Sequence, residues 1–259
     1  MILTIDIGNR RTCFGLFSNE RLVASFERVT DPKRSAEDLA EWLSRRLAEA
    51  GAEPAAILRT ILSSVVPDAV PALASAIRRL TGQALILVDR GTIGLPIKND
   101  NPASVGTERL IDALAASKRY GLPLIVINLG TATTISVLDA EGNFIGGSIS
   151  PGLQTSADSL HRAAAPLPQI EIFAESADIP VVGPDSAGSI RSGVVQGTAA
   201  MLEGMISRIE DHLGRQAIRV VTGGFAPAIL PHCRLAMNHE PHLLLCGLHD
   251  LASRGLKGE

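Results

Sequence analysis

The sequence lacks any long uninterrupted apolar segment. Hydrophobic residues make up 46% of its 259 positions, yet no stretch approaches the roughly 20 apolar residues that a membrane-spanning helix needs. Asp6 and Arg10 interrupt the first apolar run, and this argues against a secretion signal. We therefore expect a cytoplasmic protein that has no membrane partner.

Cysteine and excess charge are scarce as well. Cys13, Cys233 and Cys246 are odd in number and show neither metal-ligand nor CxxC spacing, so we expect reduced thiols and no disulfide. The formal net charge is -3 with both signs interspersed, which disfavours nucleic acid and anionic surfaces as partners. What is abundant is apolar content, and a chain of this length can form two well-packed cores.

Two segments about half the chain apart carry nearly the same pattern. The chain opens with MILTIDIGNRRTCFGLF and later reads LIVINLGTATTISVLDAEGNFIGG. Each consists of an apolar strand, an acid or amide, one further residue, a glycine, and a Thr-bearing turn into a second apolar strand. Asp6 and Gly8 correspond to Asn128 and Gly130. This repeat predicts a duplicated α/β protein whose two like turns face one cleft, rather than a short-period solenoid.

Between the repeats, short apolar runs alternate with amphipathic segments. Helices are predicted from Ser35 to Gly51, over 72–80, in a segment that ends at Tyr120, and over 153–164, 189–212 and 243–253. Strands are predicted at 60–66, 84–88 and 217–222. No low-complexity linker interrupts the chain, so we expect a boundary within a helix or tight turn near 115–122. The predicted domains are 1–117 and 118–259.

The turn after the first strand has the composition of a phosphate-binding turn. Glycine lets backbone N–H groups approach a phosphate, and the neighbouring carboxylate can hold a hydrated Mg²⁺. The candidates here are Asp6, Gly8, Asn9 and Thr12. An ordinary hairpin turn is the alternative interpretation. However, GTATT at 130–134 adds a second glycine with hydroxyls, and TGG at 222–224 ends a strand where bare backbone can approach a nucleoside.

Six motifs together resemble one enzyme family. DIGN, NPASVGTER, NLGTATT, GGSISPG, SIRSGVVQG and TGGFAP occur in the order and approximate spacing of the type III pantothenate kinases, members of the acetate kinase/Hsp70/actin superfamily. The resemblance implies an α/β fold of two related actin-like (ribonuclease H-like) domains with a nucleotide cleft between them. It also implies an ATP-dependent kinase that phosphorylates a hydroxyl of pantothenate, the first step of coenzyme A biosynthesis, in an active site completed across a homodimer.

The resemblance assigns roles position by position. The residues implied to bind ATP are Asp6, Gly8, Asn9, Arg10, Thr12, Gly130, Thr131, Gly223 and Gly224. The residues implied to bind the acidic acceptor are Asn99, Gly106, Thr107, Arg109 and Ser186. Glu108 takes the place of the catalytic base. Asp6 is expected to hold Mg²⁺ through water, and Asn128 stands where the family binds a monovalent cation.

Several of these positions depart from the family pattern. Where the family has GADR this chain has GTER, so the carboxylate of Glu108 is displaced by about 1.5 Å, and errors of about 1 Å can cost roughly a hundredfold in rate. Arg10 and Arg11 replace Thr and Asn, and their guanidinium groups can either clamp a phosphate or fill the turn. Asn128 offers no charge in place of an Asp, which predicts weak cation binding.

The positions implied for the acceptor substrate also depart from the family pattern. These departures leave two alternatives to a pantothenate kinase. Asn99 stands where an aromatic residue is usual, and Ser186 where Thr is usual. One alternative is a kinase redirected to another hydroxylated acid, and the other is a catalytically impaired homologue that acts as a regulatory or interaction protein. For the homodimer, the Ala-rich helices expected at 153–164 and 189–209 offer apolar faces.

Overall fold

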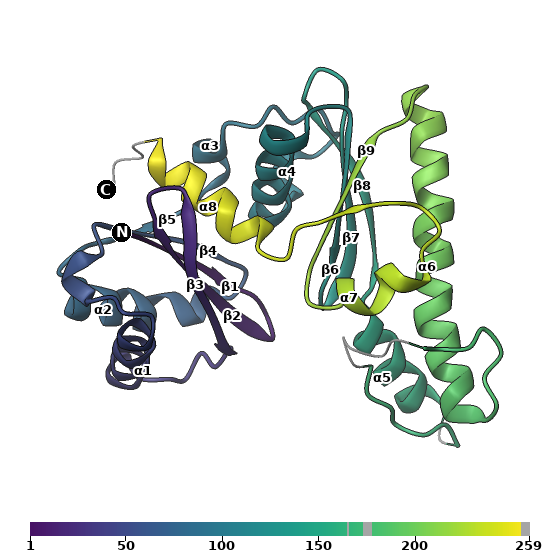
Figure 1. The fold of residues 1–259 in the computed structure, drawn as a ribbon, viewed down its shortest axis with the longest axis horizontal. Helices are drawn as coiled ribbons and strands as arrows, with labels where there is room; N and C mark the ends of the chain where they lie inside the picture. Colours follow the sequence, from purple (N-terminus) through teal and green to yellow (C-terminus); the bar gives the residue numbers. More distant parts are fainter. Residues whose placement is uncertain (165, 173–177, 255–259) are drawn as a thin grey trace. The chain divides into compact units, whose positions relative to one another are not determined.

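The computed structural model describes residues 1–164, 166–172 and 178–254. The chain forms two compact units, each built on one five-stranded sheet (Figure 1). The first unit contains residues 1–95, 103–115 and the segment from Leu243 onward, and the second contains 96–102 and 116–242. The change from one unit to the other falls within helix α4 (Thr107–Tyr120).

The first sheet combines antiparallel hairpins with parallel crossovers. Its order is β3-β2-β1-β4-β5, with β1 antiparallel to β2 and parallel to β4. The strands are β1 (Ile2–Ile7), β2 (Arg11–Ser18), β3 (Arg21–Val29), β4 (Arg59–Ser64) and β5 (Leu85–Leu87). The crossover helices are α1 (Ala36–Glu49) and α2 (Val70–Thr81), and a short α3 (Arg90–Ile93) follows. β1 therefore has a hydrogen-bonded neighbour on each side.

Local sequence explains how α1 begins and which face of the sheet it covers. The side chain of Ser35 accepts a hydrogen bond from the Asp38 N–H at 3.2 Å, which satisfies a free donor of the first turn. The buried side chains of Leu43 and Leu47 pack in the core that α1 and α2 form with the sheet. Alternate residues of β1 enter that core, namely Leu3, Ile5 and Ile7. Because successive strand side chains point to opposite faces, Asp6 points away from it.

The last helix, α8 (Leu243–Ser253), returns to the first unit. It packs against β1, β2 and β4. Phe17 stacks on His249 with ring centroids 4.4 Å apart, and Arg59 donates to the carbonyl oxygen of Ala252 at 2.6 Å. In the predicted division this helix lies in the 118–259 domain. Local sequence cannot reveal the return, because the partners of α8 lie far from it in the chain, as Arg59 and Ala252 do at a separation of 193 residues.

Residues 96–102 belong to the second unit because backbone hydrogen bonds attach them to it. The Lys98 N–H donates to the Phe144 carbonyl oxygen at 2.8 Å, and the Phe144 N–H donates to that of Pro96 at 2.8 Å. These bonds attach the segment to the start of strand β8 (Phe144–Pro151). The compact units thus differ from a division into 1–117 and 118–259 at this segment and at α8.

The second sheet repeats the topology of the first. Its strands are β6 (Leu124–Leu129), β7 (Ala132–Leu138), β8, β9 (Ile218–Thr222) and β10 (Asn238–His239), in the order β10-β9-β6-β7-β8. β6 is antiparallel to β7 and parallel to β9, as β1 is to β2 and β4. Asn128 is the fifth residue of β6 and Asp6 the fifth of β1. The predicted duplication is therefore confirmed.

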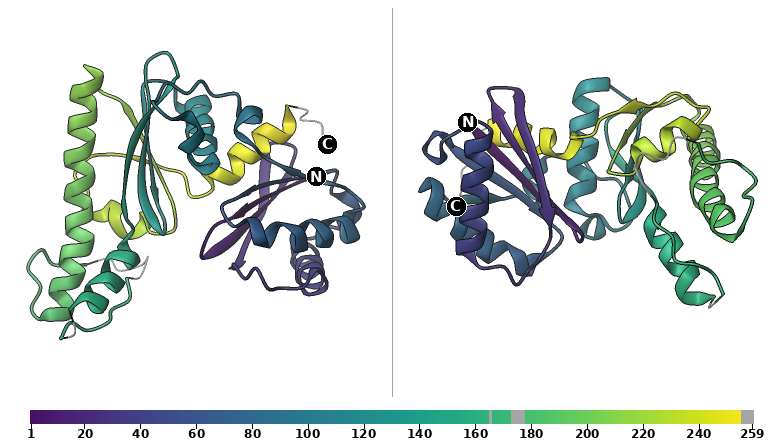
Figure 2. Two further views of the ribbon diagram at one scale, coloured as in Figure 1. Left: turned by 180° about the vertical axis from the view of Figure 1, so that it is seen from behind. Right: turned by 60° about the horizontal axis from the view of Figure 1, so that its bottom comes forward.

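Helices α5 (Leu153–Ala163) and α6 (Ser186–Leu213) and the short α7 (Ala226–Ile229) share a core with the second sheet. Figure 2 shows α6 running alongside the sheet. It begins three residues before the predicted start, because the Asp185 side chain accepts from the Gly188 N–H at 2.7 Å. Short 3-10 turns span Pro54–Ala56, Pro67–Ala69, Pro102–Ser104 and Leu230–His232. Among the described ranges, no helix has the length and apolarity needed to cross a membrane.

Two glycine substitutions test the docking of α8. A Cβ on Gly247 would lie 2.6 Å from Cγ2 of Ile111 on α4, whereas one on Gly204 of α6 would meet no heavy atom within 4 Å. Gly247→Ala should lower the free energy of unfolding by about 1–3 kcal/mol through overpacking. Gly204→Ala should raise it by roughly 0.5–1 kcal/mol, since alanine restricts the unfolded chain. Chemical denaturation measures both, and an unchanged Gly247→Ala protein would contradict the packing of α8 on α4.

Candidate functional site

The first candidate turn connects β1 to β2 and is open to solvent. The Gly8 N–H donates to the Arg11 carbonyl oxygen at 3.0 Å, which closes the turn. Asn9 and Arg10 at its tip are exposed. A Cβ on Gly8 would lie 3.1 Å from the Arg11 oxygen, so a side chain at this position would crowd the turn. The turn therefore presents backbone and the side chains of Asn9 and Arg10 to solvent, where an anion can reach them.

Asp6 precedes this turn and is surrounded by like charge. The pKa of its carboxyl is raised from an ordinary 3.8 to about 8, first by burial and then by the negative charges of Asp112 and Glu108. The side chain keeps partial access to solvent. Ionised Asp6 is thus costly in the protein alone, and a nearby cation would lower that cost.

Glu108 lies in the first turn of α4 and folds back over the residue that precedes the helix. A Cβ built on Gly106 would lie 2.6 Å from the carboxyl carbon of Glu108 and would overlap its oxygens. Oε2 of Glu108 is buried and has no hydrogen-bond partner within the described ranges. The sequence predicted that Gly106 contacts an acceptor. In the structure this glycine makes the space into which the longer Glu108 side chain folds.

Arg109 and Asp112 are the ionisable neighbours of Glu108 on α4. Burial lowers the pKa of Arg109, and the charge of Glu108 acts in the opposite direction. Asp112 is 2% exposed and lies four residues after Glu108, which places both carboxylates on one face of the helix. Asp112 is not among the residues that the sequence predicted for the site, although its spacing from Glu108 is a usable signal. Thr107 is the first residue of α4.

The second candidate turn lies at the corresponding place in the second unit. The Gly130 N–H donates to the Ala132 carbonyl oxygen at 3.1 Å. The carbonyl oxygen of Thr131 accepts from the Gly152 N–H at 3.1 Å and from the Thr155 hydroxyl at 2.8 Å. A Cβ on Gly152 would overlap the Gly130 oxygen. The start of α5 thus holds this turn closely.

The two glycines of the TGG segment serve different purposes. Gly223 has φ +96°, and a Cβ there would lie 2.5 Å from the carbonyl oxygen of Leu129. Gly223 is therefore required by the close approach of its backbone to the end of β6. A Cβ on Gly224 would meet no heavy atom within 4 Å, so this residue offers the open backbone that the sequence predicted. Asn128 pairs with Thr222, which brings the second turn and TGG together.

The predicted acceptor residues of the second unit occupy two places. Oδ1 of Asn99 is buried without a hydrogen-bond partner in the described part of the chain. Ser186 lines a groove of about 960 Å³ along α5 and α6, together with Leu160, Ile190 and Met201. Asn99 does not line this groove. The cleft expected between the two domains stays a prediction.

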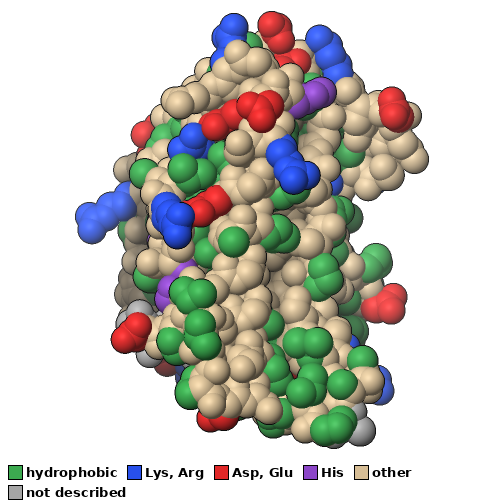
Figure 3. All heavy atoms as spheres, turned by 90° about the vertical axis from the view of Figure 1, so that its right-hand side faces the viewer, with side chains coloured by type: hydrophobic (Ala, Val, Ile, Leu, Met, Phe, Trp, Pro, Cys, Tyr) green, Lys and Arg blue, Asp and Glu red, His purple; other side chains and the backbone are tan. Residues whose placement is uncertain are grey.

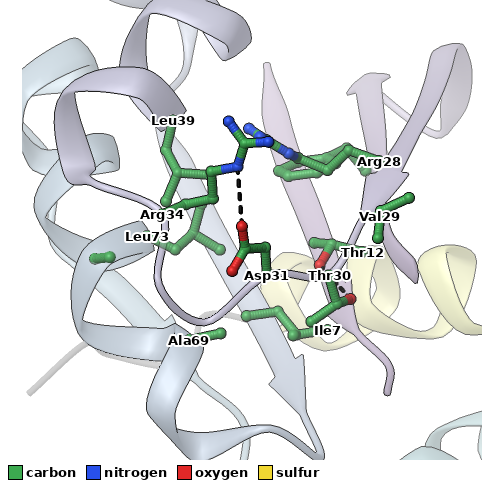
Figure 4. Close-up of a pocket in the computed structure, with 12 residues that line it drawn as sticks. Ile7, Thr12, Arg28, Val29, Thr30, Asp31, Arg34, Leu39, Ala69 and Leu73 are labelled. Atoms are coloured by element: carbon green, nitrogen blue, oxygen red, sulfur yellow. Dashed lines mark hydrogen bonds and ion pairs between the residues drawn. The ribbon is translucent and has the colours of Figure 1, made fainter. Parts of the chain in front are cut away.

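A small cavity adjoins the first turn. Thr12 and Thr30 line it together with Arg28 and Arg34, and Arg34 pairs with Asp31 at 3.2 Å (Figure 4). Its volume is about 20 Å³, enough for about one water molecule. This cavity is too small for a nucleotide or an acceptor. In the described segments, no three His, Cys, Asp or Glu side chains form a group that could hold a metal ion.

The raised pKa of Asp6 predicts how stability depends on pH. The pKa of this carboxyl is about 8 in the folded protein and 3.8 in the unfolded chain. Its contribution to the free energy of unfolding is therefore full below pH 3.8 and is lost as the pH rises from 3.8 to 8. Asp6→Asn removes this loss, so the variant should be more stable than the unmodified protein at pH 8, and the difference should shrink at pH 5. Thermal unfolding at both pH values measures the difference. An equal difference at the two pH values would contradict the burial of Asp6.

Solved structures resemble this chain in fold. A conserved Baf family protein from Campylobacter jejuni matches with a TM-score of 0.62 and 15% identity, over 97% of this chain and 98% of that one. A ROK hexokinase from Thermus thermophilus matches with a TM-score of 0.50 and 14% identity, over 98% of this chain and 99% of that one. At such identities these likenesses show the fold alone, and they bear out the predicted α/β fold of two related domains.

The sequence comparisons show the family. Residues 2–208 match the family model of type III pantothenate kinases. A protein named type III pantothenate kinase from Parafrankia sp. (strain EAN1pec) is 37% identical over 254 residues, which cover 96% of each chain. The chain belongs to the type III pantothenate kinase family.

Proposed function

We propose that this chain transfers the γ-phosphoryl group of ATP to a hydroxyl of pantothenate, the first step of coenzyme A biosynthesis. Family membership supports a phosphotransferase and does not favour a non-catalytic homologue. The observation that carries the proposal is the grouping of Asp6 beside an open turn with Glu108 and Arg109 at the start of α4. This grouping combines a metal-binding carboxylate, a proton acceptor and a cationic anchor for an acidic substrate.

The ATP side of the proposal rests on the glycine turns. The backbone N–H of Asn9 and the guanidinium of Arg10 bind phosphate oxygens at the first turn, where Gly8 leaves room for them, and Gly130 with Thr131 forms the second phosphate contact. The nucleoside approaches the open backbone at Gly224, while Gly223 keeps that backbone close to β6.

A divalent cation fits beside Asp6. The charges of Asp112 and Glu108 oppose ionisation of Asp6, and Oε2 of Glu108 is buried without a hydrogen-bond partner within the described ranges. Asp6 would hold Mg²⁺ through a water molecule. When bound, Mg²⁺ neutralises charge that develops on the transferring phosphoryl group.

The acceptor side rests on α4. Glu108 orients the acceptor hydroxyl and accepts its proton, and Arg109 holds the acceptor carboxylate through charge-assisted hydrogen bonds. Gly106 acts on this step by leaving room for the Glu108 carboxylate. We propose that Thr107, Asn99 and Ser186 complete the acceptor contacts. Phosphoryl transfer depends mainly on such positioning and on charge stabilisation.

Glu108 provides the most direct test of the catalytic assignment. Glu108→Gln should leave ATP binding nearly intact and lower the rate of phosphopantothenate formation by roughly 10²–10⁴, the range for loss of a positioned base. Gly106→Ala displaces the same carboxylate and should lower kcat by up to about a hundredfold. Glu41→Gln, an exposed carboxylate on α1, is the matched control and should leave the rate unchanged. Mass spectrometry of the product measures all four proteins.

Different outcomes separate the parts of this proposal. Unchanged turnover in Glu108→Gln would show that Glu108 is not the base. If the unmodified protein forms no phosphopantothenate at millimolar Mg-ATP, pantothenate is not the acceptor. Phosphorylation of another hydroxylated acid in the same assay would then identify a redirected kinase.

Asn128 leads to a prediction about monovalent cations. It offers an amide oxygen in place of a carboxylate, so a cation here would lack the charge that holds it. We expect the rate to change by less than about twofold when K⁺ or NH4⁺ replaces a bulky organic cation at constant ionic strength. Asn128→Asp should increase the dependence on K⁺. Strong K⁺ activation of the unmodified protein would contradict the prediction.

We also propose that two copies pair through the face formed by α5 and α6. The groove along these helices is lined largely by small and apolar residues, and Leu160 on its rim is 42% exposed. Val181 and Val182 are 74% and 83% exposed, and the Val181 carbonyl oxygen accepts from Ser192 of α6 at 2.5 Å. Figure 3 shows hydrophobic side chains gathered on part of one face. A partner copy covering the groove would complete the acceptor site at Ser186.

Substitutions on α6 test this pairing. Gly193 lines the groove, and a Cβ there would meet no heavy atom within 4 Å, so Gly193→Arg should fill the groove without disturbing the helix. Light scattering at micromolar concentration should give a dimer for the unmodified protein and a monomer for Gly193→Arg. Gly204→Arg, on the same helix but outside the groove, is the control and should remain dimeric. A monomeric unmodified protein would contradict the pairing.

A further inference from the structure

Thr30, which lies outside every motif of the sequence, makes three hydrogen bonds to the first turn. It follows β3 directly. Its N–H donates to the Arg10 carbonyl oxygen at 3.1 Å, and its hydroxyl donates to the Gly8 carbonyl oxygen at 2.7 Å. The same hydroxyl lies 3.0 Å from the hydroxyl of Thr12. Figure 4 shows the side chains of Thr12 and Thr30 beside each other and close to Ile7.

The direction of these bonds follows from counting protons. A threonine hydroxyl carries one proton and two lone pairs. Thr30 gives its proton to Gly8, so it must accept the proton of Thr12 in the second bond. Thr12, which is 7% exposed, therefore donates inside the protein and has no proton left for a phosphate. The hydrogen bonds run from Thr12 to Thr30 and from Thr30 to Gly8.

This arrangement orients the peptide groups of the turn. The peptide bonds of the turn are trans, so the C=O of one residue and the N–H of the next point in opposite directions. Because the Gly8 oxygen points toward Thr30, the Asn9 N–H points away from it. The Arg10 oxygen is held toward Thr30 as well. Two carbonyl oxygens that would repel a phosphate are thus turned away, and an N–H that would attract one is presented.

We infer that Thr30 is a positioning residue for ATP, which fixes the first turn with its N–H donor outward. This inference rests on the proposed role of that turn in binding ATP phosphates. The second unit contains an equivalent bond, since the Thr155 hydroxyl, which also lies outside the turn, donates to the Thr131 carbonyl oxygen at 2.8 Å. In both units a hydroxyl from a neighbouring segment holds a carbonyl oxygen of the turn.

Thr30→Val removes the hydroxyl, keeps the side-chain shape and retains the backbone bond to Arg10. The Gly8 oxygen and the Thr12 hydroxyl then lose their partner, and the turn can adopt other orientations. The KM for ATP should rise about tenfold, the effect of roughly 1.4 kcal/mol. Because the transfer step is unaltered once ATP is bound, kcat should stay within about twofold. Thr30→Ser restores the donor and should return the KM to within about twofold of the original.

Thr4→Val is the matched control. Thr4 is fully buried in β1 of the same hairpin, and its hydroxyl donates to the Gly15 carbonyl oxygen at 3.2 Å, away from the turn. Loss of this hydroxyl should lower the unfolding temperature and leave the KM for ATP unchanged. A general loss of stability would therefore appear in both variants, and a loss of positioning only in Thr30→Val.

Gly8→Val reports separately on the turn itself. If Gly8→Val leaves the KM for ATP unchanged, the turn is not the phosphate site, and the proposed function fails together with this inference. If Gly8→Val raises the KM but Thr30→Val does not, or if Thr4→Val raises it equally, the inference alone is overturned. Should Thr30→Val fail to fold, Thr12→Val removes the first donor and should raise the KM about threefold. An unchanged KM in Thr12→Val would also overturn the inference.

Discussion

The burial of one carboxylate among like charges is the constraint on which the first unit depends. Asp6 lies in β1, which is paired on both sides, and its charge is opposed by burial and by Asp112 and Glu108. A neutral side chain would cost less to bury at this position. Stability alone therefore does not explain an acid here, whereas the proposed binding of a cation that arrives with a nucleotide would. This is the compromise between stability and activity that functional sites commonly show.

The surrounding elements hold their groups in place around this carboxylate. The two strands that flank β1 fix the backbone of Asp6, and the first turn follows it directly. The helix α4 presents its acidic face to Asp6, and the glycine before α4 lets the Glu108 side chain fold back. The departure from the family's shorter acid is thus accommodated locally, by the absence of a side chain at position 106.

The sequence predicted the features that depend on neighbouring residues. The repeat, the capped start of α1 at Ser35 and the open turn after β1 all follow from short patterns. It did not predict that α8 joins the first sheet, or that Thr30 bonds to the turn, because those contacts join residues far apart in the chain. Gly223 shows the same limit, since a pattern cannot distinguish a glycine needed by the backbone from one that is open to a ligand.

In the proposed site, Asp6 holds the metal of its nucleotide at a cost in stability. Calorimetric titration of Mg-ATP into the unmodified protein and into Asp6→Asn at one pH measures this role. We expect that the unmodified protein binds and that the folded variant binds at least about tenfold more weakly, a difference of roughly 1.4 kcal/mol. Equal affinities in the two proteins would contradict it, because the buried acid would then have no part in holding the nucleotide and its metal.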